Sequence, residues 1–535
     1  MIPPSDLTHL REAYLKAYDD NGKDVAGRRI AKTYLDGSTG IYHGEVTKIG
    51  FIPKIFDMKA LRQMDTFAKM TYQILEKVTQ HYLDDPGYRS LFGFSPLLER
   101  LICLPTGYPC LIPIMRMDIF LDETRMDFSF CEFNTDGTSA MNEDREGANS
   151  LCLTPTFQRV RDRLDLRPQE LFEGWVDGFL DIYHSSEQAA DHGSCAPDNP
   201  DELGAVSPSA AARIAIVDYA QSSTPYEFEE FRRRFEARGV SCMICDIPEL
   251  EYHEGTLYGI DLDDQRRRAG KQSIQAVYRR AVTREIVEEL GEELGYDPYP
   301  HASFKDDTDS IRGNPAGTIQ AGNIGNADVT LSGAHALVKA VEDKRVCMIG
   351  GFVTHVAHSK QVFSVLHMPE TEAFLNAEEN DFIKSHVPYT TRLDASNIDL
   401  ELIKAHKEEW IIKPDDGYAS QGVFAGIDYD RGDWEKLVDD CSEKRYVAQA
   451  YCPQYATPNV CTNPSPGVST DLSPWNNMIG LFMYQGEFSG MFSRAGQKGI
   501  IVSFAGGMTV PNFLSQYEPG AGLALRTRPV FTQEP

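Results

Sequence analysis

Four polar residues at alternating positions in two neighbouring segments have the types that bind a hard cation. Arg116 and Asp118 lie in one apolar-rich run, and Glu132 and Asn134 lie in the next. Mg²⁺ prefers oxygen ligands from one or two carboxylates and an amide, keeps waters and completes its shell with substrate phosphates. Asp118, Glu132 and Asn134 are therefore candidate Mg²⁺ ligands, and Arg116 is a candidate partner for a phosphoryl oxygen.

A β-hairpin would bring these side chains together. The segments 111–120 and 128–134 are apolar-rich and are joined by a polar stretch, which is typical of two strands and a turn. Residues two apart on a strand share a face. If the turn centres near Thr124, Arg116 pairs with Glu132 and all four polar groups project from one face. The alternative is a solvated hairpin whose charges only pair with one another.

The neighbouring residues favour a buried metal site over a solvated hairpin. Phe128, Phe130 and Phe133 surround the acids of the second segment. Carboxylates are seldom buried without a partner, so a hairpin with this apolar setting is more consistent with a metal site than with an exposed face.

A second chemical centre is expected around Lys413. The run 410–414 reads as a strand that ends in Lys-Pro, and a loop containing Gly417 and Gly422 follows it. Such a loop can form a mobile flap over a triphosphate, with the ammonium group fixed against the phosphates. The Gly-Lys-Ser/Thr of a Walker loop is missing, so a P-loop fold is not expected.

Two later segments could complete a nucleotide pocket. The strand 445–451 carries Gln449 and Tyr451, which could offer edge groups to an adenine, although a plain core strand would look the same. The runs 478–484 and 490–494 form an expected hairpin about Gly486. Arg494 lies at the end of that hairpin.

The middle of the chain predicts a small open α/β domain. A buried-strand pattern at 213–219 is followed by Thr224-Pro225, the expected start of a helix through Ala237, and by a second strand at 240–247. Strand, helix and strand make a parallel βαβ unit, which we place at 211–300. No Gly-x-Gly-x-x-Gly follows the first strand, so a dinucleotide site is not expected there.

Three further groups have two readings each. Arg279 and Arg280 end another strand and could bind an anionic substrate or form a surface ion pair. His355 and His358 have a spacing that can bind metal, but no third ligand is evident. The Cys-x-x-Cys at 242–245 lies inside an apparent strand and favours structural thiols over zinc or redox chemistry.

The remaining organisation is coarser. Apolar residues at helical spacing predict an amphipathic helix at 59–82, and helical segments are expected over 157–183. The stretches 185–209 and 301–332 have linker-like compositions. The turn 136–139 could present backbone N–H groups to a phosphate or carboxylate, and His43 could touch a ligand.

Composition restricts the partners. The 535 residues carry 52 basic and 80 acidic side chains, for a net charge of −28. This field repels nucleic acid and anionic membranes and attracts small cations. Eleven scattered cysteines favour a reducing compartment, and the sequence has neither an apolar signal core nor a run of about 18 apolar residues. We expect a cytoplasmic protein with small-molecule partners, neither nucleic acid nor membrane, and no particular oligomeric state.

The motifs in this order resemble a known family. Arg116-x-Asp118, Glu132-x-Asn134, Lys413-Pro414 and the later Gln, Gly-Arg and Val-Pro positions are similar to those of the glutathionylspermidine synthetase family of ATP-grasp ligases. In most ATP-grasp enzymes Glu-x-Asn follows the lysines, whereas here it precedes Lys413, as in the circularly permuted arrangement. The matches span residues 115–511. We therefore expect an α+β / α/β fold, a circularly permuted ATP-grasp with an inserted open α/β substrate domain.

The resemblance also implies roles for individual residues. Lys360 and Lys413 would hold the phosphates of ATP, Gln449 and Tyr451 would line the adenine pocket, and Arg116 with Arg494 would steady the transferred phosphoryl group. The cofactors implied are ATP and Mg²⁺, the latter held by the hairpin ligands named above. The chain departs from the family at residues 418–420, which read Tyr-Ala-Ser instead of Arg-Glu-Gly, and at Asn512, where His is usual. The family's fused amidase domain is not expected.

The expected activity is ADP-forming ligation through an acyl phosphate. It would join a peptide-like or thiol-bearing acid, such as glutathione, to a small amine or polyamine. Two alternatives are a degenerate ligase that binds nucleotide without turnover and a Mg-ATP phosphotransferase. The expected organisation is a Mg-binding N-terminal part at 1–200, the α/β substrate domain at 211–300 and the lysine and adenine region at 330–535.

Overall fold

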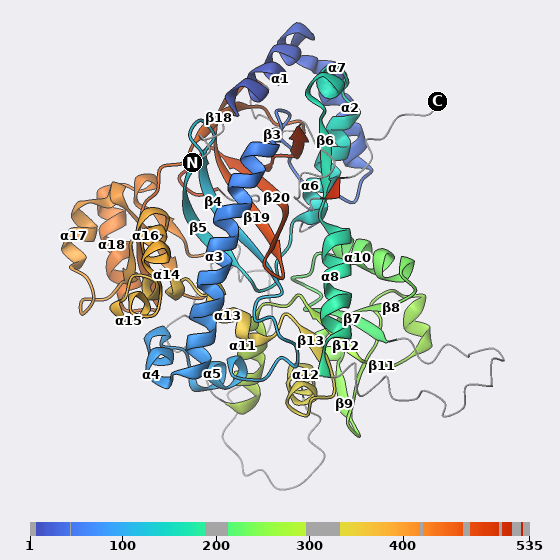
Figure 1. The fold of residues 1–535 in the computed structure, drawn as a ribbon, viewed down its shortest axis with the longest axis vertical. Coiled ribbons are helices and arrows are strands. Elements are labelled where there is room, and N and C mark those ends of the chain that lie inside the picture. The colour runs from blue at the N-terminus through green and yellow to red at the C-terminus, as the bar shows by residue number, and fades with distance from the viewer. Residues whose placement is uncertain are drawn as a thin grey trace, which may run out of the picture.

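A computed structural model describes residues 7–42, 44–187, 212–295, 332–417, 421–463, 471–501, 506–515 and 526–527. Most of both predicted linkers, together with His43 and residues 418–420, lies outside these ranges. The fold is a mixture of helices and several sheets, in agreement with the expected α+β class (Figure 1).

An antiparallel sheet forms the centre of the molecule. Its strand order is β21-β20-β19-β4-β5, and β18 also pairs with β19. The chain returns to this sheet after several hundred residues, because β19 lies between the early strand β4 and the late strand β20. The bounds are β4 (Ile114–Asp122), β5 (Asp127–Asn134), β18 (Ala456–Asn459), β19 (Ser473–Tyr484), β20 (Glu487–Gly496) and β21 (Met508–Thr509).

The β4–β5 hairpin was predicted, but its register differs from the expectation. Arg116 pairs with Asn134 and Asp118 pairs with Glu132, so Arg116 does not lie opposite Glu132. The register shifts between Asp118 and Ile119, where Cys131 is an extra residue on β5. This bulge shifts the pairing by one residue, and the turn between Asp122 and Asp127 is centred half a residue beyond Thr124, which shifts it by one more.

The long helix α3 (Met58–Asp84) runs across the central sheet (Figure 1). It confirms the helix predicted at 59–82. Asp57 begins it by accepting a hydrogen bond from the Ala60 amide at 2.7 Å. Its buried residues recur at helical spacing along the face that packs on the sheet.

A second sheet joins distant parts of the chain in the order β23-β6-β22-β3. The prediction of helical structure over 157–183 was partly wrong, since a strand separates two helices there. That strand pairs with β22 near the other end of the chain, so local sequence does not specify it. The elements are β3 (Lys54–Asp57), α7 (Pro155–Leu164), β6 (Arg167–Glu170), α8 (Phe172–His184), β22 (Asn512–Ser515) and β23 (Arg526–Thr527).

A parallel sheet, β13-β12-β7-β8, forms the open α/β unit. Its β7–α10–β8 part confirms the predicted βαβ motif. Thr224 stands at the start of α10, but its side chain makes no capping hydrogen bond, contrary to its predicted role. The elements are β7 (Arg213–Asp218), α10 (Pro225–Ala237), β8 (Ser241–Asp246), β12 (Ala276–Arg279), α11 (Thr283–Leu294), α12 (Gly333–Glu342) and β13 (Cys347–Ile349).

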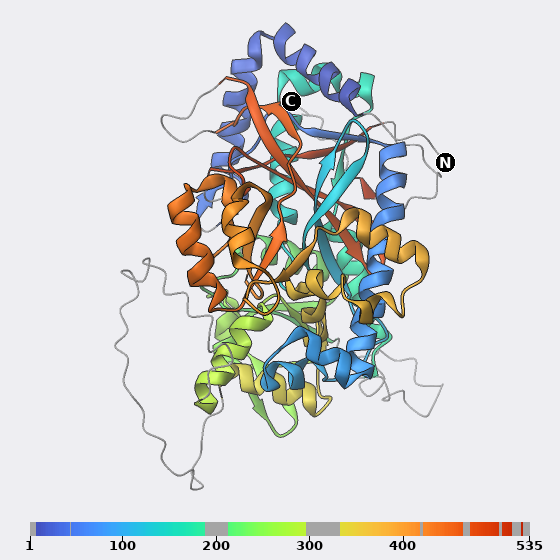
Figure 2. The ribbon, with the colours of Figure 1, turned by 90° about the vertical axis from the view of Figure 1, so that its left-hand side faces the viewer.

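A small antiparallel sheet, β14-β17-β15-β16, is covered by α17 and α18, which are among the orange helices of Figure 2. It has its own apolar core around the fully buried Trp434. The strands predicted at 410–414 and 445–451 are confirmed. The elements are β14 (Thr390–Arg392), α17 (Leu400–Ala405), β15 (Trp410–Pro414), β16 (Phe424–Ala425), α18 (Arg431–Ser442) and β17 (Tyr446–Ala450).

Shorter elements complete the described chain. They are α1 (Thr8–Asp20), α2 (Val25–Asp36), β1 (Ile41–Tyr42), β2 (Glu45–Val46), α4 (Pro86–Arg89), α5 (Pro96–Ile102), α6 (Met141–Cys152), β9 (Glu251–His253), β10 (Thr256–Gly259), β11 (Gln272–Ile274), α13 (His355–His358), α14 (Gln361–Val365), α15 (Pro369–Glu372) and α16 (Ala377–His386). Among the described helices, none has the length and apolar character needed to cross a membrane.

Candidate functional site

Two pockets adjoin where the central sheet meets the small antiparallel sheet and the α/β unit. One, of about 670 Å³, is lined mainly by apolar side chains, and the other, of about 940 Å³, is strongly polar. Glu132 and Arg494 line both. We call them the apolar pocket and the polar pocket. A ligand that fills both must pass these two side chains.

The apolar pocket lies between the β4–β5 hairpin and the β15–β17 pair. Its polar lining includes Lys413, Gln449 and Tyr451, which the sequence placed at a nucleotide site. Burial raises the pKa of Tyr451 to about 12, so its hydroxyl is neutral. Flat apolar walls with a few polar groups suit a heteroaromatic ring. The apolar walls include Phe120, Phe130, Ile411, Val423, Met478 and Ile501.

Two lysines converge on Glu132. Lys413 Nζ donates hydrogen bonds to the carbonyl of the bulge residue Cys131 at 2.9 Å and to Gln449 Oε1 at 2.8 Å. Lys360 Nζ lies 3.8 Å from Glu132 Oε2 and also donates to the Gly417 carbonyl. Burial raises the pKa of Glu132, but Lys360, Lys413 and Arg116 outweigh it and hold that pKa at about 2. Glu132 is therefore an ionised carboxylate at the junction.

Arg116 and Asp118 form a buried bidentate pair. Arg116 donates from Nε to Oδ1 at 2.7 Å and from Nη2 to Oδ2 at 2.9 Å. Asn134 Nδ2 donates to the same carboxylate at 3.1 Å. Asp118 is 0% exposed and both its oxygens are occupied, whereas Arg116 and Asn134 line the polar pocket. Asp118 thus holds its two neighbours in place.

These side chains suit a Mg²⁺ ion that is bound together with substrate phosphates. They suit less well a Mg²⁺ ion whose ligands all come from the protein. Glu132 and Asn134 face the polar pocket and could supply one carboxylate and one amide oxygen. Asp118 would become available only if Arg116 released it. Within the described ranges, no group of three or more His, Cys, Asp or Glu side chains is arranged for a metal ion. The metal alternatives for the histidines at 355 and 358 and for the Cys-x-x-Cys at 242–245 are therefore not supported.

The polar pocket contains three guanidinium groups. Arg116 and Arg494 both lie over the ring of Phe492, at 5.3 and 5.1 Å from its centroid. Arg280 is 4% exposed and pairs with Glu227 at 3.0 Å, while its Nε and Nη1 have no hydrogen-bond partner among the described residues. The alternative prediction of a surface ion pair at Arg280 is wrong, because this pair is buried. Unpartnered buried donors beside a pocket suit an anionic ligand.

Acidic groups from the α/β unit face these arginines. Asp218, at the carboxyl end of β7, and Glu285 on α11 line the polar pocket. Burial raises the pKa of Asp218 to about 7; Arg280 opposes this shift, and Glu285 and Asp246 add to it. Neither Asp218 nor Glu285 was predicted as a site residue. The position of Asp218 at the end of a predicted strand could have indicated its role, because ligands bind at the carboxyl ends of strands in open α/β sheets.

A buried network lies beneath the pocket. Asp136 pairs with Arg279 and accepts a hydrogen bond from the Thr283 amide at 2.6 Å. His355 lies 3.8 Å from Asp136 and 3.6 Å from Asp416, just before the flap segment. Burial raises the pKa of Asp136, but Arg279 outweighs it and the pKa is lowered. These groups support the turn 136–139, which lines the polar pocket as the sequence suggested.

The remaining predicted residues lie at the margin. The Gly417 carbonyl contacts Lys360, and Gly422 has a left-handed φ of 66° two residues after the undescribed stretch 418–420. As far as the described residues define them, neither the apolar nor the polar pocket is lined by Gly417, Gly422 or Lys360. In place of the family's His, Asn512 donates to Asp144 Oδ1 at 2.8 Å, away from both pockets.

Gly480 provides a test of how tightly the arginine pair is packed. A Cβ at this position would lie 2.6 Å from both Arg116 Cδ and Asp118 Oδ1. Gly480→Ala should therefore displace the pair and cost about 1–3 kcal/mol of unfolding free energy, measured by urea denaturation. Gly432→Ala on α18, where the nearest atom is 3.7 Å away, is the matched control and should be neutral or slightly stabilising. Equal effects of the two changes would contradict this packing.

Comparisons with known proteins find likeness to solved structures but not to family models or curated sequences. No family model and no curated protein matches this chain. Among solved structures, it is similar to a glutathione synthetase-like effector from Globodera pallida in its apo form, at 12% identity and a TM-score of 0.49. The alignment covers 95% of this chain and 98% of that one. A likeness of this degree carries no functional argument.

The fold and site define a mixed α+β protein with adjoining apolar and polar pockets.

Proposed function

We propose that this protein is an ATP-dependent carboxylate–amine ligase. The observation that carries the proposal is the junction at Glu132, where an apolar pocket with a buried lysine opens into a polar pocket with three arginines. Such a site suits a nucleotide whose phosphates point toward an anionic second substrate. The order of the segments, with the Glu-x-Asn hairpin before both lysines, supports a circularly permuted ATP-grasp arrangement.

The nucleotide would lie with adenine in the apolar pocket. Gln449 and Tyr451 border that pocket, and Lys413 stands between it and the junction. Lys413 and Lys360 would neutralise the phosphates. Glu132 and Asn134 would hold Mg²⁺ together with phosphate oxygens, and the metal would supply charge stabilisation at the transferred group.

The acid would lie in the polar pocket beside Arg116 and Arg494. A carboxylate is a poor electrophile, so its oxygen would attack the γ-phosphorus and release ADP, forming an acyl phosphate. The two guanidinium groups would stabilise the negative charge on the phosphoryl oxygens. An amine would then attack the acyl carbon, release inorganic phosphate and lose a proton, which completes the amide.

The α/β side of the pocket suggests what else the acid carries. Arg280 lines the pocket and carries two buried N–H groups without a hydrogen-bond partner among the described residues, and Asp218 and Glu285 lie in the same pocket. A guanidinium group beside two acidic side chains is suited to bind an α-amino acid group. The ligand's carboxylate would bind Arg280, and its ammonium group would bind Asp218. This chemistry agrees with a peptide-like acid such as glutathione, and a polyamine is the amine that the family resemblance suggests.

Binding of such a head group should depend on the protonation of Asp218. Because the pKa of Asp218 is raised to about 7, its carboxyl is mostly neutral at pH 6 and mostly ionised at pH 8. The affinity for an acid with an ammonium group should therefore rise about tenfold over this interval. Isothermal titration of the acid identified by turnover would measure it. Asp218→Asn should flatten the profile, and an unchanged rise in that variant would assign it to another group.

The enzyme assay separates the proposal from its alternatives. The protein is incubated with Mg-ATP, candidate acids and hydroxylamine, and ADP, phosphate and hydroxamate are measured. Acid-dependent hydroxamate supports the ligase. ATP binding without acid-dependent ADP or hydroxamate supports a degenerate ligase, and a phosphorylated product without amide supports a phosphotransferase. Mass spectrometry of a cell-extract incubation with ATP would then identify the acid and the amine.

A further inference from the structure

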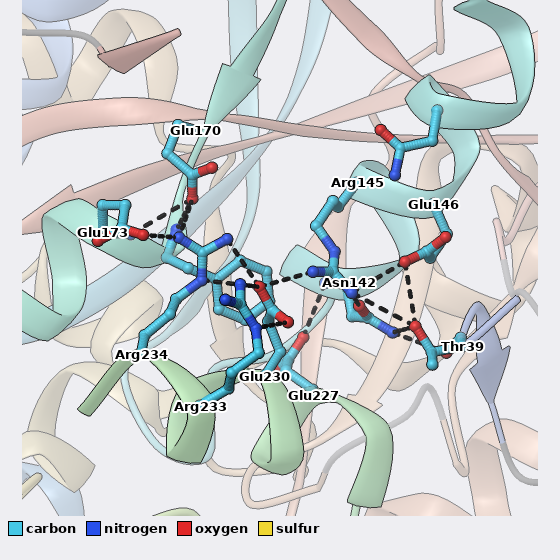
Figure 3. Close-up of polar contacts among 12 residues, drawn as sticks. Thr39, Asn142, Arg145, Glu146, Glu170, Glu173, Glu227, Glu230, Arg233 and Arg234 are labelled. Atoms are coloured by element: carbon cyan, nitrogen blue, oxygen red, sulfur yellow. Dashed lines mark hydrogen bonds and ion pairs between the residues drawn. The ribbon is translucent and has the colours of Figure 1, made fainter. Parts of the chain in front are cut away.

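Helix α10 carries two buried glutamates with different surroundings. Glu227 and Glu230 lie on neighbouring positions of the helix face that packs toward α6, at 3% and 7% exposure (Figure 3). Glu230 lies within a cluster of arginines. Glu227 contacts the first turn of α6 and one arginine of the polar pocket. Only Glu227 therefore touches the machinery of the site.

One oxygen of Glu227 caps helix α6 from outside. Glu227 Oε2 accepts hydrogen bonds from the amides of Ala140 and Asn142, each at 3.1 Å. Ala140 is the residue at the start of α6 and has no side chain that could serve as a cap. Its φ of 87° lies in the left-handed region, which is unfavourable for alanine. The carboxylate stabilises a strained helix start.

The other oxygen holds the pocket arginine. Glu227 Oε1 forms an ion pair with Arg280 Nη2 at 3.0 Å, although neither this oxygen nor Nε and Nη1 of Arg280 has a partner in hydrogen-bond geometry among the described residues. Directly before the capped residue, the Ser139 carbonyl accepts a hydrogen bond from Arg116 Nη1 at 2.9 Å. One buried carboxylate thus connects two guanidinium groups that line the polar pocket.

We propose that Glu227 is a positioning residue that sets the spacing between Arg116 and Arg280 for the acid substrate. This proposal depends on the proposed function only for the identity of the ligand. The carboxylate orients Arg280 directly and orients Arg116 through the Ala140 turn and the Ser139 carbonyl. None of its contacts among the described residues involves a lining residue of the apolar pocket, so we expect its loss to act on acid binding and not on nucleotide binding.

Glu230 supplies a matched control. It lies three residues along the same helix and pairs with Arg145 at 2.6 Å and with Arg233 and Arg234 at 2.7 Å (Figure 3). None of these arginines lines either pocket. Glu230→Gln removes a buried negative charge from the same helix without touching the first turn of α6 or Arg280. This variant therefore measures the effect of losing a buried charge between α10 and α6 that does not depend on Arg280.

The first test needs no substrate. In Glu227→Gln, hydrogen exchange of a peptide spanning residues 138–144, which excludes the Glu230 partner Arg145, should speed up at least tenfold. Phenylglyoxal should modify Arg280 several-fold faster, because the neighbouring carboxylate that favours its charged form is gone. In Glu230→Gln, both rates should stay within twofold of the wild type. Unchanged rates in Glu227→Gln, or equal changes in both variants, would overturn the proposal.

The second test measures kinetics once an acid is known. Glu227→Gln should raise KM for the acid at least tenfold, with kcat lowered less and KM for ATP unchanged, and Glu227→Asp should recover part of the loss. A loss confined to kcat, or an equal rise in both KM values, would reject the positioning role. If no acid supports turnover in the wild type, the ligase proposal is wrong. The hydrogen-exchange and phenylglyoxal rates still test the positioning role of Glu227 in that case.

A double variant covers the case in which Glu227→Gln does not fold. Ala140→Gly removes the unfavourable left-handed strain at the helix start. The Ala140→Gly/Glu227→Gln protein should fold and still show the fast modification of Arg280. Wild-type reactivity of Arg280 in that folded protein would show that Glu227 acts only on helix stability, and the proposal would be wrong.

Discussion

Glu132→Gln should lower ATP-dependent turnover about a thousandfold while the protein stays folded. Glu132 is the carboxylate at the junction of the two pockets, with Lys360 at 3.8 Å and Lys413 close by. The amide of Gln is nearly the same size but carries no charge. A Mg-nucleotide would lose its carboxylate ligand, and loss of one such electrostatic partner typically costs about 10²–10³ in rate.

The measurement is steady-state ADP release with the acid that supports turnover, together with circular dichroism to verify folding. Asp122→Asn is the control on the same hairpin, since Asp122 caps the exposed turn through Thr124 and contacts neither pocket. That variant should retain wild-type turnover. Full activity of Glu132→Gln would remove Glu132 from the metal site.

Arg116→Met should destabilise the protein by about 3–5 kcal/mol, the largest stability effect expected here. Asp118 is 0% exposed and receives both of its shortest hydrogen bonds from Arg116. Removing the guanidinium leaves a buried carboxylate without its charge partner. The free energy of unfolding, taken from urea denaturation, should fall by that amount.

The double variant Arg116→Met/Asp118→Asn should recover most of this loss, because neither charge is then buried alone. It should fold but show no acid-dependent turnover, since Arg116 lines the polar pocket. Arg125→Met is the control on the same hairpin. Arg125 is 71% exposed and pairs with Asp122 at the surface, so its loss should cost about 0–1 kcal/mol. Additive effects of the two buried substitutions would contradict a coupled pair.

Local patterns predicted the elements that carry the site. The period-two alternation at Arg116, Asp118, Glu132 and Asn134 predicted the hairpin and its polar face, and apolar spacing predicted α3. The two-residue spacing of the polar groups on β4 and β5 and the one-sided burial of α3 are visible in a single sequence, even though β4 is buried on both faces from Ile114 to Ile119. The strand at Lys413 was predicted for the same reason.

Other features depend on partners far along the chain. Strand β6 was missed because it pairs with β22, and the hairpin register was wrong because Cys131 forms a bulge whose carbonyl accepts a hydrogen bond from Lys413. Asp218 was missed as a site residue because it looks like the polar end of a core strand until Arg280 is placed beside it.

The sequence by itself determined the residue types, the strands and helices that carry them, and the order in which the candidate ligands and lysines occur. Only the tertiary structure decided that Asp118 is closed by Arg116 while Glu132 faces both pockets, because exposure depends on what packs against a side chain. It also brought Glu227 from α10 to the first turn of α6. Contacts between residues so distant in sequence form when separate sheets and helices pack together, and no local pattern encodes them.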